Sequence, residues 1–176
     1  IFVINELPDL QPRIQVALLN IMQERDIQIR GFNVRIPLDL SMAFSANPED
    51  YTNRGNIITP LKDRIDAQII THYPKSVVLG MEITSQEVGK RLSGSIETRI
   101  HPVYRELIEE IAFQARTSDY VDQKSGVSTR MTITAMEQAL SSAEKRAITH
   151  GEDHALVRIA DIFNTVPALT GKIELV

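Results

Sequence analysis

The first six residues of the chain constrain its fold more than any other segment. Ile1–Ile4 is a continuous apolar run, and the polar residues Asn5 and Glu6 end it. A short run without polar alternation is typical of a strand covered on both faces, as in a parallel sheet between layers of helices. Ligands of such sheets bind at the carboxyl ends of the strands. The run therefore predicts a buried strand that presents Asn5 and Glu6 to a ligand.

The rest of residues 1–74 predicts further elements of an α/β domain. Apolar residues recur every three or four positions in one stretch, which indicates an amphipathic helix, and they alternate with polar residues in the next, which indicates a hairpin. The inward stripe of the helix comprises Ile14, Ala17, Leu18, Ile21 and Met22. We predict a helix capped by Asp9, with Pro12 in its first turn and an end near Glu24, followed by a hairpin over 27–36 that turns at Gly31 and Asn33. A second buried strand is predicted over 41–46, ending at Asn47. A short helix start at Leu61–Arg64 and a third strand over 68–73 complete the predicted elements.

From Lys75 onward the pattern predicts helices only. We expect helices over 77–92, from Pro102 onward, across Met136–Ala147 with a stop at Gly151, and across Ala155–Val166. Short connections and one-sided apolar stripes are typical of a small helical bundle. The boundary is expected at Pro74–Lys75, which gives two domains over residues 1–74 and 75–176.

Composition narrows the class of protein. Hydrophobic residues make up 43% and charged residues 24% of the 176 residues, as in ordinary soluble domains. The formal net charge of -4 disfavours nucleic acid and anionic membranes as general partners. The chain has no cysteine, which excludes disulfides, thiolate catalysis and cysteine-bound metals. No apolar stretch reaches the roughly 18 residues that a membrane span needs, and no signal segment is evident, so we expect a cytoplasmic protein.

The order of these features resembles that of the AAA+ ATPases, above all the branch that holds the magnesium-chelatase ATPase subunit and the MoxR-type ATPases. The hairpin segment Gln23–Leu38, the strand end Ala46-Asn47-Pro48 and the segment Leu61–Arg64 match that branch. The resemblance covers essentially the whole chain and is strongest over residues 1–74. It implies an α/β fold: the C-terminal half of an AAA+ αβα core, with parallel strands and an inserted hairpin, followed by an α-helical lid.

The resemblance also assigns roles to five residues. Asn5 and Glu6 fall on the Walker B pair, where both would hold Mg²⁺ and Glu6 would activate the attacking water. Asn47 falls on sensor 1 at the γ-phosphate, Arg64 on the arginine finger that reaches the nucleotide of the adjacent subunit, and Arg130 on sensor 2, which ties the lid to the nucleotide. Asn5 departs from the usual Asp, because an amide brings no negative charge to the metal.

Activity and partners follow from the same resemblance. It implies that the intact protein binds ATP and Mg²⁺, hydrolyses ATP within a homo-oligomeric ring, expected to be a hexamer, and remodels a protein partner. The Walker A loop of such a core is not in residues 1–176, so we expect no hydrolysis from this stretch in isolation. Two other functions fit the same residues: a transcriptional activator of the alternative-sigma-factor type, and a non-hydrolysing oligomerisation scaffold in which Asn5 reflects lost catalysis.

Each motif taken alone also has a structural interpretation. A strand-terminal Asn-Glu pair can serve as a helix cap or a turn, and Asp63-Arg64 also fits a solvated helix end. The three arginines of the hairpin fit an exposed polar face better than a partner or nucleic-acid contact, whereas an exposed Phe32 predicts contact with another molecule. His150 and His154 have the spacing of metal ligands on a helix, but the sequence offers no evident third ligand, so we do not expect a metal there.

Overall fold

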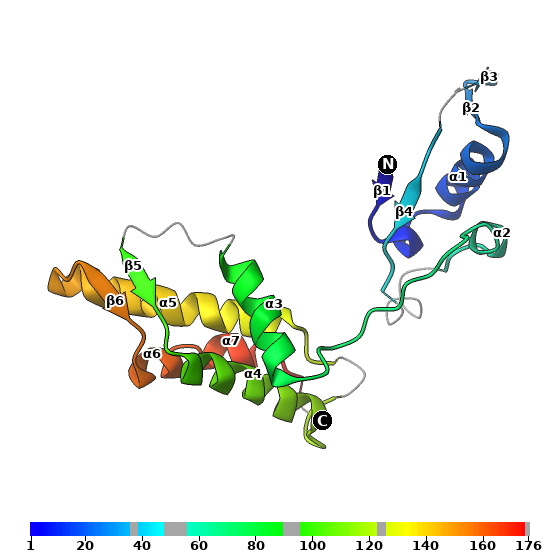
Figure 1. Cartoon of the computed structure of the whole chain (residues 1–176). Coiled ribbons are helices and arrows are strands. Elements are labelled where there is room, and N and C mark those ends of the chain that lie inside the picture. Colours follow the sequence, from blue (N-terminus) through cyan, green and yellow to red (C-terminus); the bar gives the residue numbers. More distant parts are fainter. Residues whose placement is uncertain (36–38, 48–55, 90–95, 123–125, 175–176) are drawn as a thin grey trace. The chain divides into compact units, whose positions relative to one another are not determined.

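The computed structural model describes residues 1–35, 39–47, 56–89, 96–122 and 126–174. They form two compact units, Ile1–Ile70 and Thr71–Val176 (Figure 1). Each unit contains one parallel pair of strands together with several helices, so the fold is mixed α/β. Within the described part of the chain, every helix is too short or too polar to cross a lipid bilayer.

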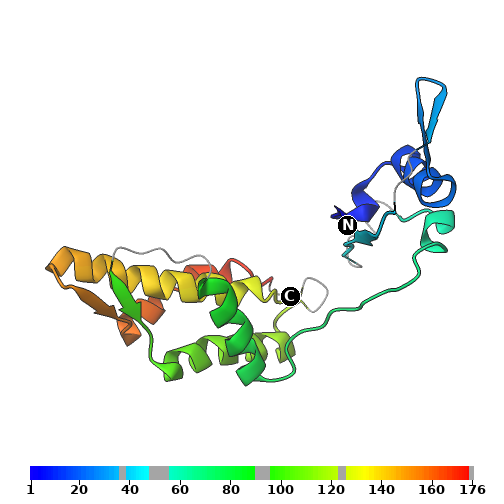
Figure 2. The ribbon, with the colours of Figure 1, turned by 45° about the horizontal axis from the view of Figure 1, so that its top comes forward.

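In the first unit, two strands that are distant in sequence lie side by side. β1 (Phe2–Ile4) pairs in parallel with β4 (Met42–Phe44). The remaining elements are the 3-10 helix η1 (Leu7–Asp9), α1 (Pro12–Glu24), the hairpin strands β2 (Asp26–Ile29) and β3 (Phe32–Arg35), and α2 (Thr59–Lys62). Figure 2 shows the hairpin in blue, extending beyond α1. Because parallel strands run in the same direction, the carboxyl ends of β1 and β4 lie at one edge of the sheet.

The prediction that β1 is covered on both faces is wrong. The side chains of Phe2 and Val3 are 52% and 61% exposed. The apolar cluster of this unit comprises Leu7, Leu18 and Leu61, with Ile4, Leu10, Ile21, Met22, Met42, Phe44, Ile57, Ile58 and Ile65 around them. Among the described residues β1 has β4 as its strand neighbour and no other. Two strands and one apolar cluster cannot bury both faces of a run this apolar.

The predicted cap and inward face of α1 need correction. Asp9 does not cap α1, because it ends the 3-10 turn η1, and Gln11 is the N-cap residue with Pro12 in the first turn. The buried face is also rotated from the expected stripe: Ile14 is 42% exposed, whereas Gln15 is fully buried. The polar side chain takes this position because its hydrogen bonds to the backbone are all made there, as described below.

The predicted hairpin is present, but its turn lies earlier than expected. Arg30 and Gly31 form the two-residue loop with φ of 50° and 86°, and Asn33 pairs with Gln28 inside the ladder. Two consecutive positive φ angles define a type I′ turn, whose twist matches that of the flanking strands. The register places four apolar residues on one face, and three of them are exposed: Ile29, Phe32 and Val34.

The third predicted strand, over 68–73, is wrong. This segment has neither helix nor strand and no strand partner among the described residues, and Ile69 and Ile70 are 90% and 79% exposed. Its last residue, Tyr73, instead contacts the helical unit: the guanidinium of Arg116 lies 4.6 Å from the centroid of the Tyr73 ring. Burial lowers the pKa of Arg116, against the opposing charges of Glu109 and Tyr73. This contact lies within the second unit, Thr71–Val176.

The second unit contains the predicted helices and one strand pair that the sequence did not predict. Its helices are α3 (Val77–Gly89), α4 (Pro102–Thr117), α5 (Arg130–His150), α6 (Ile159–Phe163) and α7 (Val166–Thr170). The strands β5 (Glu97–Arg99) and β6 (His154–Leu156) pair in parallel. The expectation of helices only is therefore wrong, because three-residue strands with polar sequences such as Glu-Thr-Arg carry no periodic apolar signal.

Of two helices predicted in the second unit, one ends where expected and the other is not a single helix. Gly151 closes α5 in the left-handed conformation with φ of 69°, as predicted. The helix predicted across Ala155–Val166 is wrong, because Ala155 lies in β6 and the remainder divides into α6 and α7. Pro167 stands in the first turn of α7, where its missing N–H costs nothing and it cannot continue a preceding helix.

A buried polar group joins three helices of the second unit. Glu109 of α4, Thr84 of α3 and Thr132 of α5 are each 1% exposed. The Thr84 hydroxyl donates to the Glu109 carboxylate and lies 2.8 Å from the Thr132 hydroxyl. Gly80 allows this approach, because a Cβ there would lie 2.5 Å from Glu109 Oε2. The network therefore specifies how α3, α4 and α5 pack.

A second buried carboxylate, Asp161, fixes α6 against α5. It accepts hydrogen bonds from Ser142 Oγ at 2.9 Å, Arg146 Nη2 at 3.0 Å and the Arg158 backbone N–H at 2.9 Å. Burial alone would raise the pKa of the Asp161 carboxyl, but these three donors outweigh burial and hold the pKa below its ordinary value of 3.8. The Asp161 carboxyl is therefore ionised in the folded protein at neutral pH.

We expect Asp161→Asn to lower the free energy of unfolding by about 2 kcal/mol at neutral pH, because charge-assisted hydrogen bonds are lost. The native pKa lies below the unfolded one, so this stabilisation is present above the unfolded pKa and disappears as the pH falls through the native pKa. Urea unfolding should therefore show a difference in stability between wild type and variant that narrows as the pH falls below the ordinary carboxyl pKa of 3.8. Glu152→Gln is the control, since Glu152 lies 3.9 Å from Arg146 and is 40% exposed. A gap independent of pH would contradict the ionised role.

Candidate functional site

The carboxyl ends of β1 and β4 form the candidate site. Asn5 and Glu6 follow β1 directly, and Ser45, Ala46 and Asn47 follow β4. Parallel pairing of Ile4 with Phe44 brings these two segments next to each other, although about forty residues separate them in the sequence. The structure therefore brings the predicted residues Asn5, Glu6 and Asn47 to one edge of the first unit, and all three side chains are exposed there.

Ser45 connects the two strand ends through every polar group that it has. Its backbone N–H donates to Ile4 O at 3.0 Å, and its carbonyl accepts from the Leu7 N–H at 2.9 Å. Its hydroxyl accepts from the Glu6 N–H at 3.1 Å and lies 3.4 Å from Asn5 Oδ1, to which it donates. One residue thus contacts four consecutive residues of the facing segment. Sequence analysis did not select Ser45; its hydroxyl at the end of an apolar strand is the signal that was available.

Glu6 has an unusual backbone conformation. Its φ of 54° and ψ of 55° lie in the left-handed region, which residues with a side chain seldom adopt. The conformation reverses the chain between β1 and η1, so that Leu7 enters the apolar cluster while the Glu6 carboxylate stays exposed. Such conformations cost about 1–3 kcal/mol and concentrate at functional sites. Here it directs a carboxylate away from the apolar cluster at the end of a strand.

Arg64 lies in the first unit, just after α2. Its Nη1 donates to the Pro60 carbonyl at 2.8 Å, and its buried Nε has no hydrogen-bond partner among the described residues. The bond to Pro60 fixes one side of the guanidinium fork. Arg64 follows Leu61, which packs in the same apolar cluster as Leu7, the residue after Glu6.

Gln15 joins α1 to the segment that leads into α2, and sequence analysis missed it. Its Nε2 donates to Leu10 O at 2.9 Å and to Asn56 O at 3.2 Å, and its Oε1 accepts from the Ile58 N–H at 2.9 Å. A glutamine one position from an apolar stripe is easily taken for a solvent-facing residue. The three bonds instead position the start of α2 and, through it, the segment that carries Arg64.

We expect Gln15→Leu to lower the free energy of unfolding by about 3 kcal/mol, because the change leaves three partly buried backbone groups without the side-chain partner that they have in wild type. Gln23→Leu is the matched control: Gln23 is exposed on the same helix, and a change there should stay within about 0.5 kcal/mol. Chemical denaturation followed by circular dichroism measures both. Equal stability of the two variants would show that the buried bonds do not hold the segment.

Arg130, the remaining predicted residue, belongs to the second unit. It is the first residue of α5, its side chain is exposed, and its backbone N–H donates to the Ser128 hydroxyl at 3.2 Å. The two histidines discussed above do not share a helix face, because His150 ends α5 and His154 lies in β6. Among the described residues no three His, Asp or Glu side chains gather as a metal site.

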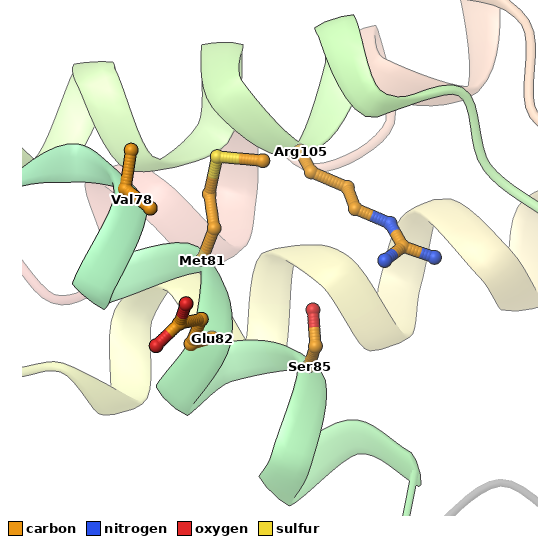
Figure 3. Close-up of a pocket in the computed structure, with 5 residues that line it drawn as sticks. All are labelled: Val78, Met81, Glu82, Ser85 and Arg105. Atoms are coloured by element: carbon orange, nitrogen blue, oxygen red, sulfur yellow. The ribbon is translucent and has the colours of Figure 1, made fainter.

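The second unit has a shallow groove between α3 and α4, of about 420 Å³ (Figure 3). Its lining residues are Val78, Met81, Glu82, Ser85 and Arg105. In Figure 3 the Arg105 guanidinium lies on the Ser85 side of the groove, and Met81 reaches toward α4. None of the residues predicted to act on a nucleotide lines this groove, so it is separate from the candidate site.

Comparison with models of known protein families gave no match, and neither did comparison with curated proteins. Among solved structures, the chain is similar to a crystal structure from Cytophaga hutchinsonii that is described as a "putative ATPase". The two sequences are 18% identical and the TM-score is 0.41. The match covers 99% of this chain and 58% of that chain, so the chain spans less than two thirds of the protein it resembles. A likeness at this level decides neither family nor activity.

Proposed function

We propose that this chain is part of an AAA+ ATPase of the magnesium-chelatase or MoxR type, and that the whole protein binds ATP and Mg²⁺ and hydrolyses ATP. One observation carries the proposal: β1 and β4 are parallel neighbours, and their carboxyl ends bring a carboxylate, Glu6, next to the segment that ends at Asn47. Ligands of parallel α/β sheets bind at this edge. Phosphoryl transfer needs positioned polar groups more than covalent chemistry.

The proposed roles follow from the chemistry of each side chain. The Glu6 carboxylate accepts a proton from the attacking water and orients it. The Asn47 amide hydrogen-bonds the γ-phosphate or that water, and Asn5 offers an amide oxygen to a water bound to Mg²⁺. Arg64 supplies positive charge to the γ-phosphate of the adjacent subunit, and Arg130 ties the helical unit to the nucleotide. Asn5 and Glu6 fit a site that shares its Mg²⁺ with the phosphates, since Mg²⁺ in such sites takes only one or two protein ligands.

The assembly and the partner belong to the same proposal. The role proposed for Arg64 at the nucleotide of an adjacent subunit needs an assembly of subunits, and we propose a homo-oligomeric ring, a hexamer. Hydrolysis would move the helical unit against the α/β unit and so remodel a protein partner. A scaffold without hydrolysis is the second candidate function, and the specific observation that favours it is the amide of Asn5 at the metal position, where a carboxylate would bind Mg²⁺ more strongly.

ATP turnover by the full-length protein, with Mg²⁺ and in every assembly state that can be isolated, tests the proposal. We expect turnover above background that requires Mg²⁺. Tight ATP binding without turnover would reject the ATPase function and support the second candidate function, a scaffold without hydrolysis. Absence of both binding and turnover would reject a nucleotide function for this site.

A further inference from the structure

The side chain of Ser45 makes contacts that strand pairing does not require. Two of its four hydrogen bonds are made by its backbone and do not depend on the side chain. The Ser45 N–H donates to Ile4 O, and the Leu7 N–H donates to the Ser45 carbonyl. The other two are made by the hydroxyl with the two residues between Ile4 and Leu7: it accepts from the Glu6 N–H and donates to Asn5 Oδ1. The backbone of Ser45 therefore holds Ile4 and Leu7, and within Ser45 only the hydroxyl contacts Asn5 and Glu6, the residues between them.

We propose that Ser45 is a positioning residue that sets the orientation of Glu6, and with it that of Asn5, for the reaction. This inference rests on the proposed function. The hydroxyl accepts the N–H of a residue held at φ of 54°, so it supports a conformation that residues with side chains seldom adopt. It also donates to Asn5 Oδ1 at 3.4 Å, a long contact that favours one orientation of the Asn5 amide. A single hydroxyl thus contacts both residues of the proposed Walker B pair, the backbone of Glu6 and the side chain of Asn5.

The position of Ser45 also connects the pair to Asn47. Ser45 precedes Asn47 by two residues in the segment that follows β4. Loss of the hydroxyl should affect the chemical step more than ATP binding, because neither Asn47 nor the strand pairing is altered.

The test compares Ser45→Ala, Ser45→Thr and Ser41→Ala in the full-length protein. Ser45→Ala should lower kcat by about 10²-fold with little change in KM for ATP, since small displacements of a reacting group have effects of this size. Ser45→Thr keeps the hydroxyl and should retain most of the activity. Ser41→Ala is the matched control at the opposite end of β4, where Ser41 contacts Phe2 through its backbone carbonyl.

Hydrogen exchange provides a readout that does not depend on activity. In Ser45→Ala the Glu6 amide should exchange faster, while the Leu7 amide stays protected by the Ser45 carbonyl. If wild type hydrolyses ATP and Ser45→Ala matches it in kcat, the positioning role is wrong and the ATPase proposal stands. If Ser45→Thr is as slow as Ser45→Ala, the hydroxyl is not the active element and the inference is overturned. If wild type does not hydrolyse ATP, the proposed function fails and this inference fails with it.

Discussion

Glu6→Gln in the full-length protein should lower ATP turnover by about 10²–10⁴-fold, the usual contribution of a general base, while ATP binding remains. The amide has nearly the size of the carboxylate but cannot accept the proton of the attacking water. The backbone of Glu6 is held by Ser45 Oγ and by the bonds of Ile4 and Leu7 to Ser45. The substitution should therefore leave the strand ends in place and remove the base, while the amide oxygen of Gln can still face Mg²⁺.

Steady-state hydrolysis together with a fluorescent-nucleotide binding assay measures both halves of this prediction. Glu24→Gln, the same change at an exposed position at the end of α1, is the control and should behave as wild type. Turnover of Glu6→Gln within a few-fold of wild type would exclude Glu6 as the base. Loss of nucleotide binding in Glu6→Gln would instead indicate that the carboxylate contributes mainly to holding Mg²⁺, and binding assays with and without the metal would separate that contribution from catalysis.

The parts of the fold that could be predicted from the sequence are those with a strong local pattern. The apolar runs that end at Asn5 and at Asn47 located β1 and β4, and the turn formers located the hairpin. The long periodic segments located α4 and α5, and Gly151 located the end of α5. In each case a few neighbouring residues carry the whole signal.

The errors arise where long-range contacts decide the structure. Residues 68–73 have the composition of a strand, but a strand needs a partner, and Tyr73 contacts Arg116 instead. Gln15 turns inward on α1 because Leu10, Asn56 and Ile58 offer it three backbone partners, two of them more than forty residues away. β5 exists because β6 lies beside it, although Glu-Thr-Arg has no apolar pattern. Local periodicity contains no information about such partners.

In the candidate site, too, the residues with a local sequence signal were predicted, and the residue that depends on long-range contacts was missed. Asn5, Glu6 and Asn47 could be selected because each follows an apolar run directly. Ser45 was missed: its hydroxyl at the end of an apolar run was visible in the sequence, but its bonds to Asn5 and Glu6, about forty residues earlier in the chain, were not. Its hydroxyl gains meaning only once the register of β1 and β4 is known.

Arg64→Ala should lower ATP turnover of the assembled full-length protein by about 10³–10⁵-fold, the range for an arginine finger supplied by a neighbour. The bond from Nη1 to Pro60 O anchors one side of the guanidinium within its own subunit. The fork is thereby held in one orientation, with N–H groups left to donate to a phosphate. Lys62→Ala, a loss of positive charge two residues earlier at the end of α2, is the control and should retain turnover.

A mixing experiment decides whether Arg64 acts on its own nucleotide or on that of a neighbour. Arg64→Ala subunits keep Glu6, and Glu6→Gln subunits keep Arg64, so each variant alone should be inactive. In an equal mixture of ring-forming subunits, about one interface in four pairs an intact Glu6 with an intact Arg64 from the neighbour, and turnover should return. Two inactive variants that fail to complement each other, in rings shown to contain both, would place Arg64 in its own active site. Full activity of Arg64→Ala by itself would exclude the residue from catalysis, because a charge that contributes this much to the transition state cannot be removed without effect.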